Sequence, residues 1–180
     1  MPGENDNSRT TVLVIFNENN QGPVVLYELL TKNGHPCKFI YYLNDNHANK
    51  LALKDFVRNS GTMLIGFSFA SQSAETAFGL SAYLRQECQG IPLIFGGVHP
   101  TVDPVSCVDH CDAACIGEGE KTLLEIADKL DKGEDYRSSG NLVYKKDGRI
   151  IRNEINPLIT DMDVLPVRRP YTEDHVAIKQ

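Results

Sequence analysis

Residues Ile91–Pro100 read IPLIFGGVHP, an apolar run followed by a turn that begins with two glycines. Ile91–Phe95, with the apolar run Leu93–Phe95, predicts a short buried strand, because parallel strands that are covered on both faces read as uninterrupted apolar runs. The same pattern occurs three more times in the sequence. The other apolar runs are Val12–Phe16, Met63–Phe67 and Ala113–Ile116, and their turns are Asn17–Gly22, Ser68–Ser71 and Gly117–Glu120.

Helical patterns separate these runs and complete the prediction of the fold. Lys38–Leu43 is a further strand, which we expect to be less buried than Val12–Phe16 because it carries Tyr41 and Tyr42. Helices are expected over residues 23–33, 48–59, 72–89, 103–108 and 120–130. Five strand–helix repeats predict an α/β fold, a doubly wound, flavodoxin-like or Rossmann-like sheet of five parallel strands in the order 2-1-3-4-5.

The C-terminal part of the chain follows a different pattern. Asn141–Lys146 and Arg149–Glu154 flank Asp147-Gly148, which is a strong signal for a β-hairpin outside the repeat. The segment that follows is punctuated by prolines and reads as a linker. The predicted divisions are a disordered lead-in over residues 1–10, an α/β domain over 11–136, a hairpin extension over 137–156 and a linker over 157–180.

Composition and charge exclude several classes of partner. The 180 residues carry a formal net charge of −6, and the only basic pair is Arg168-Arg169, so nucleic acid is not an expected partner. No stretch approaches the roughly 18 apolar residues of a membrane span. The first ten residues are polar and resemble no secretory or transit signal. Five cysteines without an export signal indicate reduced thiols and a cytoplasmic location.

In an open parallel sheet, the turns named above lie together at the carboxyl edge, where ligands bind. Small residues at all four turns indicate a crevice for a large, flat ligand. A phosphoryl-accepting receiver domain needs carboxylates where this chain has Asn17 and Ser68. A flavodoxin-type phosphate loop needs hydroxyl groups, which residues 17–22 lack, and the dinucleotide motif G-x-G-x-x-G is absent after the first strand.

A corrinoid ligand agrees better with these turns. The block Gly96–Thr101 with Asp103-Pro104, followed by Gly117–Glu120 and Thr122–Leu124, resembles the N-terminal cobalamin-binding domain of cobalamin-dependent radical S-adenosylmethionine (SAM) proteins. The segments Gly140–Tyr144 and Asp163–Pro166 are similar to the part that joins this domain to the radical SAM barrel. The resemblance covers about residues 10–170. It implies cobalamin as the cofactor of this chain, and a 4Fe–4S cluster and SAM in a radical SAM domain in cis.

The chemistry of cobalamin explains why such residues suit it. Gly96 and Gly97 remove side chains where a corrin ring passes the backbone, and Gly117 and Gly119 let backbone N–H groups approach a polar ligand. Serine hydroxyls can bind the nucleotide tail or the corrin amides. Glu118 and Glu120 either accept from amides or stabilise the following helix. The expected cofactor-binding residues are Asn17, Asn19, Gly22, Ser68, Phe69, Ala70, Ser71, Gly96, Gly97, Val98, His99, Gly117, Glu118, Gly119 and Glu120.

The first turn lacks a cobalt ligand. Corrinoid domains of the D-x-H-x-x-G type place a histidine there, whereas this chain has Asn17-x-Asn19-x-x-Gly22. Asparagine is a poor cobalt ligand. We therefore expect base-off cobalamin without a protein histidine, as the radical SAM resemblance implies. His47 follows the second strand and reads as a polar loop residue, while His99 either lines the cofactor or makes a structural hydrogen bond.

The cysteines do not form a radical SAM motif. Cys107, Cys111 and Cys115 have the spacing C-x3-C-x3-C, which differs from the C-x3-C-x2-C of radical SAM clusters, and they fall on a helix, a loop and a strand. We expect them to be structural and expect no metal ligand in this chain. Catalysis is therefore expected of a longer, methyltransferase-like enzyme and not of this chain alone. The alternatives are a stand-alone corrinoid carrier or sensor and a vestigial domain that has lost the cofactor.

Overall fold

A computed structural model gives the structure of the chain and describes residues 9–17, 20, 22–161, 163, 165–166 and 175–178, the last four by their backbone only. Its helices are α1 (Gly22–Lys32), α2 (His47–Asn59), α3 (Ala74–Glu87), α4 (Val98–Val102), α5 (Pro104–Cys107) and α6 (Glu120–Lys132). Short 3₁₀ helices span Ser71–Ser73 and Tyr136–Ser138. The strands are β1 (Thr10–Ile15), β2 (Cys37–Tyr42), β3 (Thr62–Ser68), β4 (Leu93–Gly96), β5 (Ala113–Cys115), β6 (Leu142–Lys146), β7 (Arg149–Arg152) and β8 (His175–Ile178).

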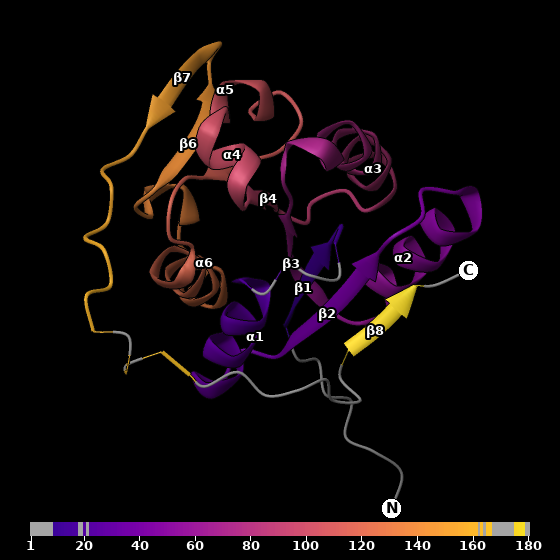
Figure 1. Cartoon of the computed structure of the whole chain (residues 1–180), viewed down its shortest axis with the longest axis horizontal. Coiled ribbons are helices and arrows are strands. Elements are labelled where there is room, and N and C mark those ends of the chain that lie inside the picture. The colour runs from indigo at the N-terminus through magenta and orange to yellow at the C-terminus, as the bar shows by residue number, and fades with distance from the viewer. Residues whose placement is uncertain are drawn as a thin grey trace, which may run out of the picture.

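All described strands form one sheet in the order β7-β6-β5-β4-β3-β1-β2-β8 (Figure 1). The predicted parallel order 2-1-3-4-5 is confirmed. The prediction of only five strands is wrong. An edge strand carries unpaired N–H and C=O groups that a further strand can bind. At one edge β6 pairs antiparallel with β5, and at the other β8 pairs parallel with β2.

The predicted hairpin is confirmed. Asp147 and Gly148 connect β6 to β7, and both have positive φ, at 49° and 75°. Two successive residues with positive φ match the tight turns whose twist suits a two-residue hairpin loop. The hairpin is therefore defined by its turn, and pairing with β5 places it in the main sheet.

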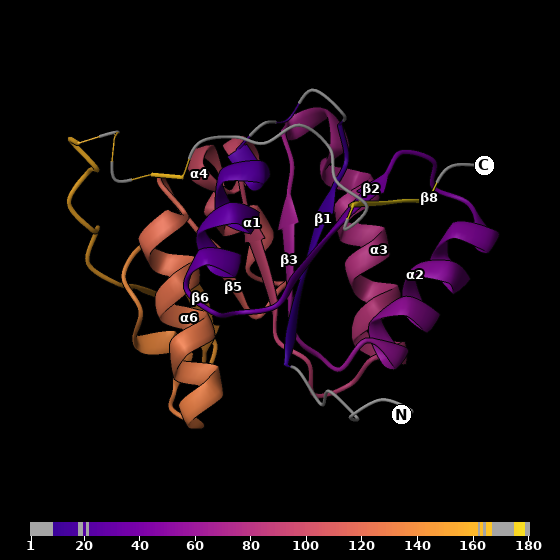
Figure 2. The same ribbon diagram turned by 90° about the horizontal axis from the view of Figure 1, so that it is seen from below.

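Helices cover both faces of the sheet, with α1 and α6 on one side and α2 and α3 on the other (Figure 2). Alternate residues of β1 illustrate the two cores, because Leu13 faces α1 and α6 whereas Val12 and Val14 face α2 and α3. β2 is slightly less buried than β1, as expected, because Lys38 is half-buried whereas every residue of β1 is buried. The expected reason is wrong, since both tyrosines are buried. Tyr41 is 3% and Tyr42 1% exposed, because each ring packs into one of the two cores.

Candidate cofactor-binding site

A cavity of about 500 Å³ lies between the sheet and helices α1 and α6. Its lining includes side chains within the sheet and the turns that follow β3, β4 and β5, so it reaches from the core to the carboxyl edge. The volume falls in the range typical of small-molecule sites. We call its inner part the slot, lined by Leu13, Leu26, Gly66, Ile94, Leu123 and Ile126.

The floor of the slot depends on Gly66. The register places Gly66 beside Leu13 on β1 and beside Ile94 on β4, so one row across the sheet reads Leu-Gly-Ile. A Cβ atom at Gly66 would lie 2.9 Å from the Cδ2 atom of Leu13. On β3 and β4, the next row toward the edge carries only the small residues Ser68 and Gly96. Between the edge and the slot, β3 and β4 therefore present no large side chain on this face.

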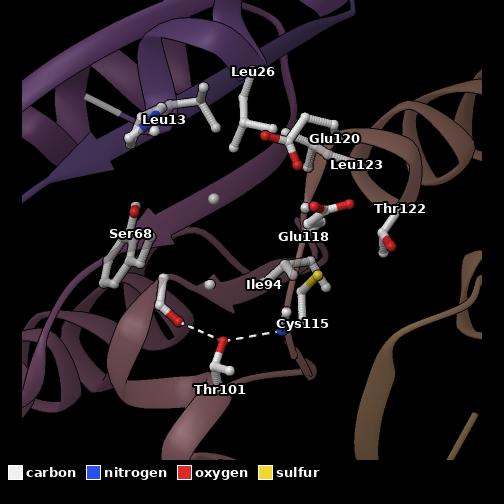
Figure 3. A pocket seen from close by; sticks show the side chains of 18 of the residues that line it. Leu13, Leu26, Ser68, Ile94, Thr101, Cys115, Glu118, Glu120, Thr122 and Leu123 are labelled. Carbon is white, nitrogen blue, oxygen red and sulfur yellow. Dashed lines mark hydrogen bonds between the residues drawn. The ribbon is translucent and has the colours of Figure 1, made fainter. Parts of the chain in front are cut away.

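The walls of the slot are apolar. The aliphatic side chains of Leu26 on α1, Leu123 on α6 and Ile94 on β4 all line the cavity (Figure 3). Cys115 lines the cavity at the end of β5, and burial raises the pKa of its thiol to about 12. This thiol is therefore protonated at neutral pH and does not add charge to the wall.

The turn after β4, at the mouth of the cavity, has a backbone conformation that requires glycine at residue 97. Gly97 has φ 96° and ψ −162°, a region that only glycine adopts readily. A Cβ atom there would lie 2.8 Å from the carbonyl oxygen of Phe69 and 2.9 Å from its nitrogen. Backbone bonds from Phe69 N–H to the Gly96 carbonyl and from His99 N–H to the Phe69 carbonyl lock the two turns together. The sequence predicted a turn at residues 96–100, but residues 98–102 form the short helix α4.

Thr101 of α4 joins the turns after β4 and β5. Its hydroxyl donates to the carbonyl oxygen of Gly97 over 2.8 Å and accepts from the N–H of Gly117 over 3.0 Å (Figure 3). Gly117 also has a positive φ of 74°. The side chain of Thr101 therefore fixes the relative position of both glycine turns.

The turn after β1 completes the mouth. The side-chain amide of Asn20 donates to the Ser68 hydroxyl over 3.0 Å, and its Oδ1 atom accepts from Gly22 N–H over 3.3 Å. Asn17 lines a smaller cavity of about 110 Å³ that shares Asn20, Ser68, Gly97 and Val98 with the larger one. Phe69 and Ala70 also line this smaller cavity, while Asn19 lies outside the described residues.

Gly117–Glu120 form the remaining rim. The α6 helix begins here without a side-chain N-cap, so backbone N–H groups of its first turn are available at the mouth. Glu118 lines the cavity and also contacts the chain beyond the hairpin. Its Oε2 atom accepts from Ile159 N–H over 2.9 Å, and its carbonyl oxygen accepts from the Asn141 side chain over 2.8 Å.

Two of the predicted cofactor-binding residues, Ser71 and His99, lie away from the two cavities. Both ring nitrogens of His99 contact serine hydroxyls, Nδ1 with Ser71 at 3.0 Å and Nε2 with Ser106 at 3.2 Å. Neither His99 nor Ser71 lines either cavity. His47 is exposed at the start of α2, on the opposite side of the sheet from the slot.

The three cysteines of the C-x3-C-x3-C pattern do not converge. Cys107 and Cys111 belong to the core that faces α2 and α3, whereas Cys115 belongs to the core on the other face. The Cys111 thiol donates to the Cys107 carbonyl over 3.2 Å. Within the described residues, no three His, Cys, Asp or Glu side chains gather as metal ligands would.

Sequence reasoning did not identify the residues that line the slot. An isolated glycine inside a strand indicates a close approach by a ligand or another backbone, and Gly66 carries this signal. Asn20 and Thr101 act through partners that are far away in sequence, at Ser68 and Gly117, so no local pattern marks them.

Comparisons with known proteins agree with this geometry. A family model described as the B12 binding domain matches residues 18–127. An uncharacterized methyltransferase from Pyrococcus horikoshii is 25% identical over 144 residues, which are 77% of this chain and 30% of that protein. The anaerobic magnesium-protoporphyrin IX monomethyl ester cyclase of a Synechocystis species is 28% identical over 108 residues, 58% of this chain and 22% of that protein. Among the described residues, no helix is long and apolar enough to cross a membrane.

Solved structures share the fold. The radical SAM methyltransferase TsrM from Kitasatospora setae, with cobalamin and a 4Fe–4S cluster bound, gives a TM-score of 0.72 at 19% identity, over 93% of this chain and 32% of that one. The cobalamin-dependent radical SAM enzyme OxsB, with aqua-cobalamin and SAM bound, gives 0.70 at 17% identity, over 84% and 23%.

This chain spans about a third or less of the length of each of these proteins. The resemblance to cobalamin-binding domains of cobalamin-dependent radical SAM proteins, noted from the sequence, is confirmed. Because the matched family model covers more than half of its residues, the chain belongs to the B12-binding domain family.

Proposed function

We propose that this chain binds cobalamin with the nucleotide tail in the slot and the corrin ring over the carboxyl edge. The observation that carries this proposal is the row Leu13–Gly66–Ile94, where a missing side chain opens the sheet beneath α1 and α6. Cobalamin has an aromatic base at the end of its tail and a phosphate and amides nearer the corrin. An apolar slot behind a polar mouth matches that order of groups.

The rim supplies the polar partners. Ser68 presents a hydroxyl, and the uncapped first turn of α6 presents backbone N–H groups, which favour a phosphate. Gly97 and Gly117 allow close approach of the backbone. The residues we propose to contact the cofactor are Asn17, Asn19, Gly22, Ser68, Phe69, Ala70, Gly96, Gly97, Val98, Gly117, Glu118, Gly119 and Glu120. In this proposal His99 and Ser71 support the turns from behind, through their mutual hydrogen bond.

Cobalamin, when bound, supplies the cobalt chemistry, and this chain holds, orients and shields it. We propose the base-off form without a protein histidine ligand. Two observations support this: His99 is hydrogen-bonded to Ser71 and Ser106, and His47 lies across the sheet.

Electron paramagnetic resonance of the cob(II)alamin complex tests the axial ligand. We expect no nitrogen superhyperfine splitting, because no imidazole and no benzimidazole reaches the cobalt. Splitting that persists in a His99→Gln variant would indicate the benzimidazole or another histidine, and splitting that His99→Gln removes would assign His99 as the ligand. Either result would contradict the proposed state.

The whole protein is proposed to be a cobalamin-dependent radical SAM enzyme, with SAM and a 4Fe–4S cluster in a further domain in cis. Its reaction would be methyl transfer, radical rearrangement or cyclisation. Val98 and Val102 line the cavity and are 64% and 75% exposed, and Val105 on the following helix α5 is 48% exposed. An exposed apolar patch of this kind is typical of a surface that another domain covers. This favours the enzyme over a stand-alone carrier or sensor.

Equilibrium dialysis against hydroxocobalamin tests binding directly. We expect saturable uptake of one equivalent per chain, because one continuous cavity is proposed as the site. Dialysis also detects weak binding, which matters if a further domain contributes affinity. Absence of uptake across the accessible concentration range would overturn the proposal and support a vestigial domain that has lost the cofactor.

A further inference from the structure

We propose that the slot selects among cobamides by their nucleotide base, preferring apolar phenolic or benzimidazole bases to purines such as adenine. This inference rests on the proposed function, because it concerns the same slot. It goes beyond that function by naming what the slot rejects. The determinants are the apolar side chains Leu13, Leu26, Ile94, Leu123 and Ile126 around Gly66.

The side chains of the slot offer no hydrogen-bonding group. Leu13, Ile94 and Ile126 are 4%, 3% and 0% exposed, and all three are aliphatic. The backbone beneath them is also engaged, because β3 is paired with β1 on one side and with β4 on the other. A base that enters the slot therefore meets hydrocarbon on its faces and edges.

Two of the polar side chains that line the cavity already have partners, and the carboxylate of Glu120 lies at its rim. The hydroxyl of Thr122 donates to the Gly140 carbonyl over 3.2 Å and accepts from the Asn156 side chain at the same distance. The hydroxyl of Thr101 joins the two glycine turns at the mouth. Cys115 contributes a neutral thiol, which is only a weak donor.

Bases differ in how many polar atoms they bring into such a slot. A phenolic base brings no ring nitrogen, benzimidazole brings one that is free when the base leaves cobalt, and adenine brings several together with an exocyclic amine. A polar group buried without a partner loses its hydrogen bonds to water without compensation. We therefore expect an adeninyl cobamide to bind about ten-fold or more weakly than a phenolic one.

Competition dialysis of the full chain with cresolyl, benzimidazolyl and adeninyl cobamides tests this order. The cresolyl–adeninyl pair is decisive, because cresol cannot coordinate cobalt and adenine does so weakly, so release of the base from cobalt contributes little to the difference. Cobinamide, which lacks the tail, gives the baseline. We expect cresolyl cobamide to bind at least about ten-fold more tightly than adeninyl cobamide.

Variants in α1 test whether the difference in affinity between the cresolyl and adeninyl cobamides arises in the slot or from a general effect of mutating this helix. Leu26 lines the slot and is half-buried, so Leu26→Gln adds an amide that can pair with a purine. We expect this variant to narrow the cresolyl–adeninyl difference. Leu29→Gln makes the same change on the same helix at a half-buried residue that does not line the cavity, and should retain the difference.

Each outcome distinguishes this inference from the proposed function. If cobalamin binds but the cresolyl and adeninyl forms have equal affinities, selection by the base is wrong and cobalamin binding stands. If Leu29→Gln narrows the difference as much as Leu26→Gln, the slot wall is not its cause. If no cobamide binds, both the inference and the proposed function are wrong.

Discussion

A Gly66→Leu variant is expected to lose at least about a hundred-fold in cobalamin affinity while keeping its fold. The new side chain would project from β3 into the slot, in the row between Leu13 and Ile94. Burial of one aromatic group contributes a few kcal/mol, and about 2.7 kcal/mol corresponds to a hundred-fold change in the dissociation constant. The first contact would be the Cδ2 atom of Leu13, the end of a flexible side chain that can move.

The stability of the apo Gly66→Leu variant should be unchanged or higher, because leucine fills an apolar cavity and removes a strand glycine. Thermal unfolding and equilibrium dialysis together check both parts of this prediction. Gly79→Leu is the matched control, since Gly79 is exposed on α3 and a Cβ atom there would have no neighbour within 4 Å, and it should bind normally. Cobinamide should bind both variants alike. Normal cobalamin binding by a folded Gly66→Leu protein would show that the tail does not enter the slot.

A Gly97→Ala variant is expected to lose about 3 kcal/mol of unfolding free energy, because its backbone conformation is strained for any other residue. The added Cβ atom would also meet backbone atoms of Phe69 at 2.8 and 2.9 Å, which cannot rotate away. For a chain of this size, that loss lowers the melting temperature by about 6–12 °C. Differential scanning calorimetry of the apo protein measures it.

Gly133→Ala provides the comparison for Gly97. Gly133 also has a positive φ, 70°, at the end of α6, but nothing lies within 4 Å of its Cβ position. We expect a loss of only about 1 kcal/mol there, from the left-handed conformation alone. Equal losses in the two variants would mean that the close approach of the turns after β3 and β4 contributes nothing.

Local sequence patterns were enough to predict the central fold. Val12–Phe16 and Leu93–Phe95 are short apolar runs of the kind typical of buried strands, and Asp147-Gly148 identified the hairpin. Pairing across the sheet edges has no local signature, so the attachment of β6 to β5 and of β8 to β2 was not predicted. Tyrosine is amphipathic, and this made the burial of β2 hard to predict from its sequence.

The rim of the candidate site was easier to predict than its interior. Glycines such as Gly97 and Gly117 mark turns by themselves, and the structure places both at the mouth of the cavity. The slot arises from residues on five different elements, and only Gly66 carried a recognisable signal. The sequence left open whether His99 lines the cofactor. In the structure the His99 ring is hydrogen-bonded to Ser71 and Ser106, and the positions of these serines follow from tertiary structure.

Nuclear Overhauser effects between bound Co(III) cobalamin and the methyl-labelled protein test the position of the tail most directly. The benzimidazole protons should show contacts with methyl groups of Leu13, Ile94 and Ile126, which line the slot. Contacts confined to Val98 and Val102, the exposed valines of α4, would place the base outside the slot and contradict the account.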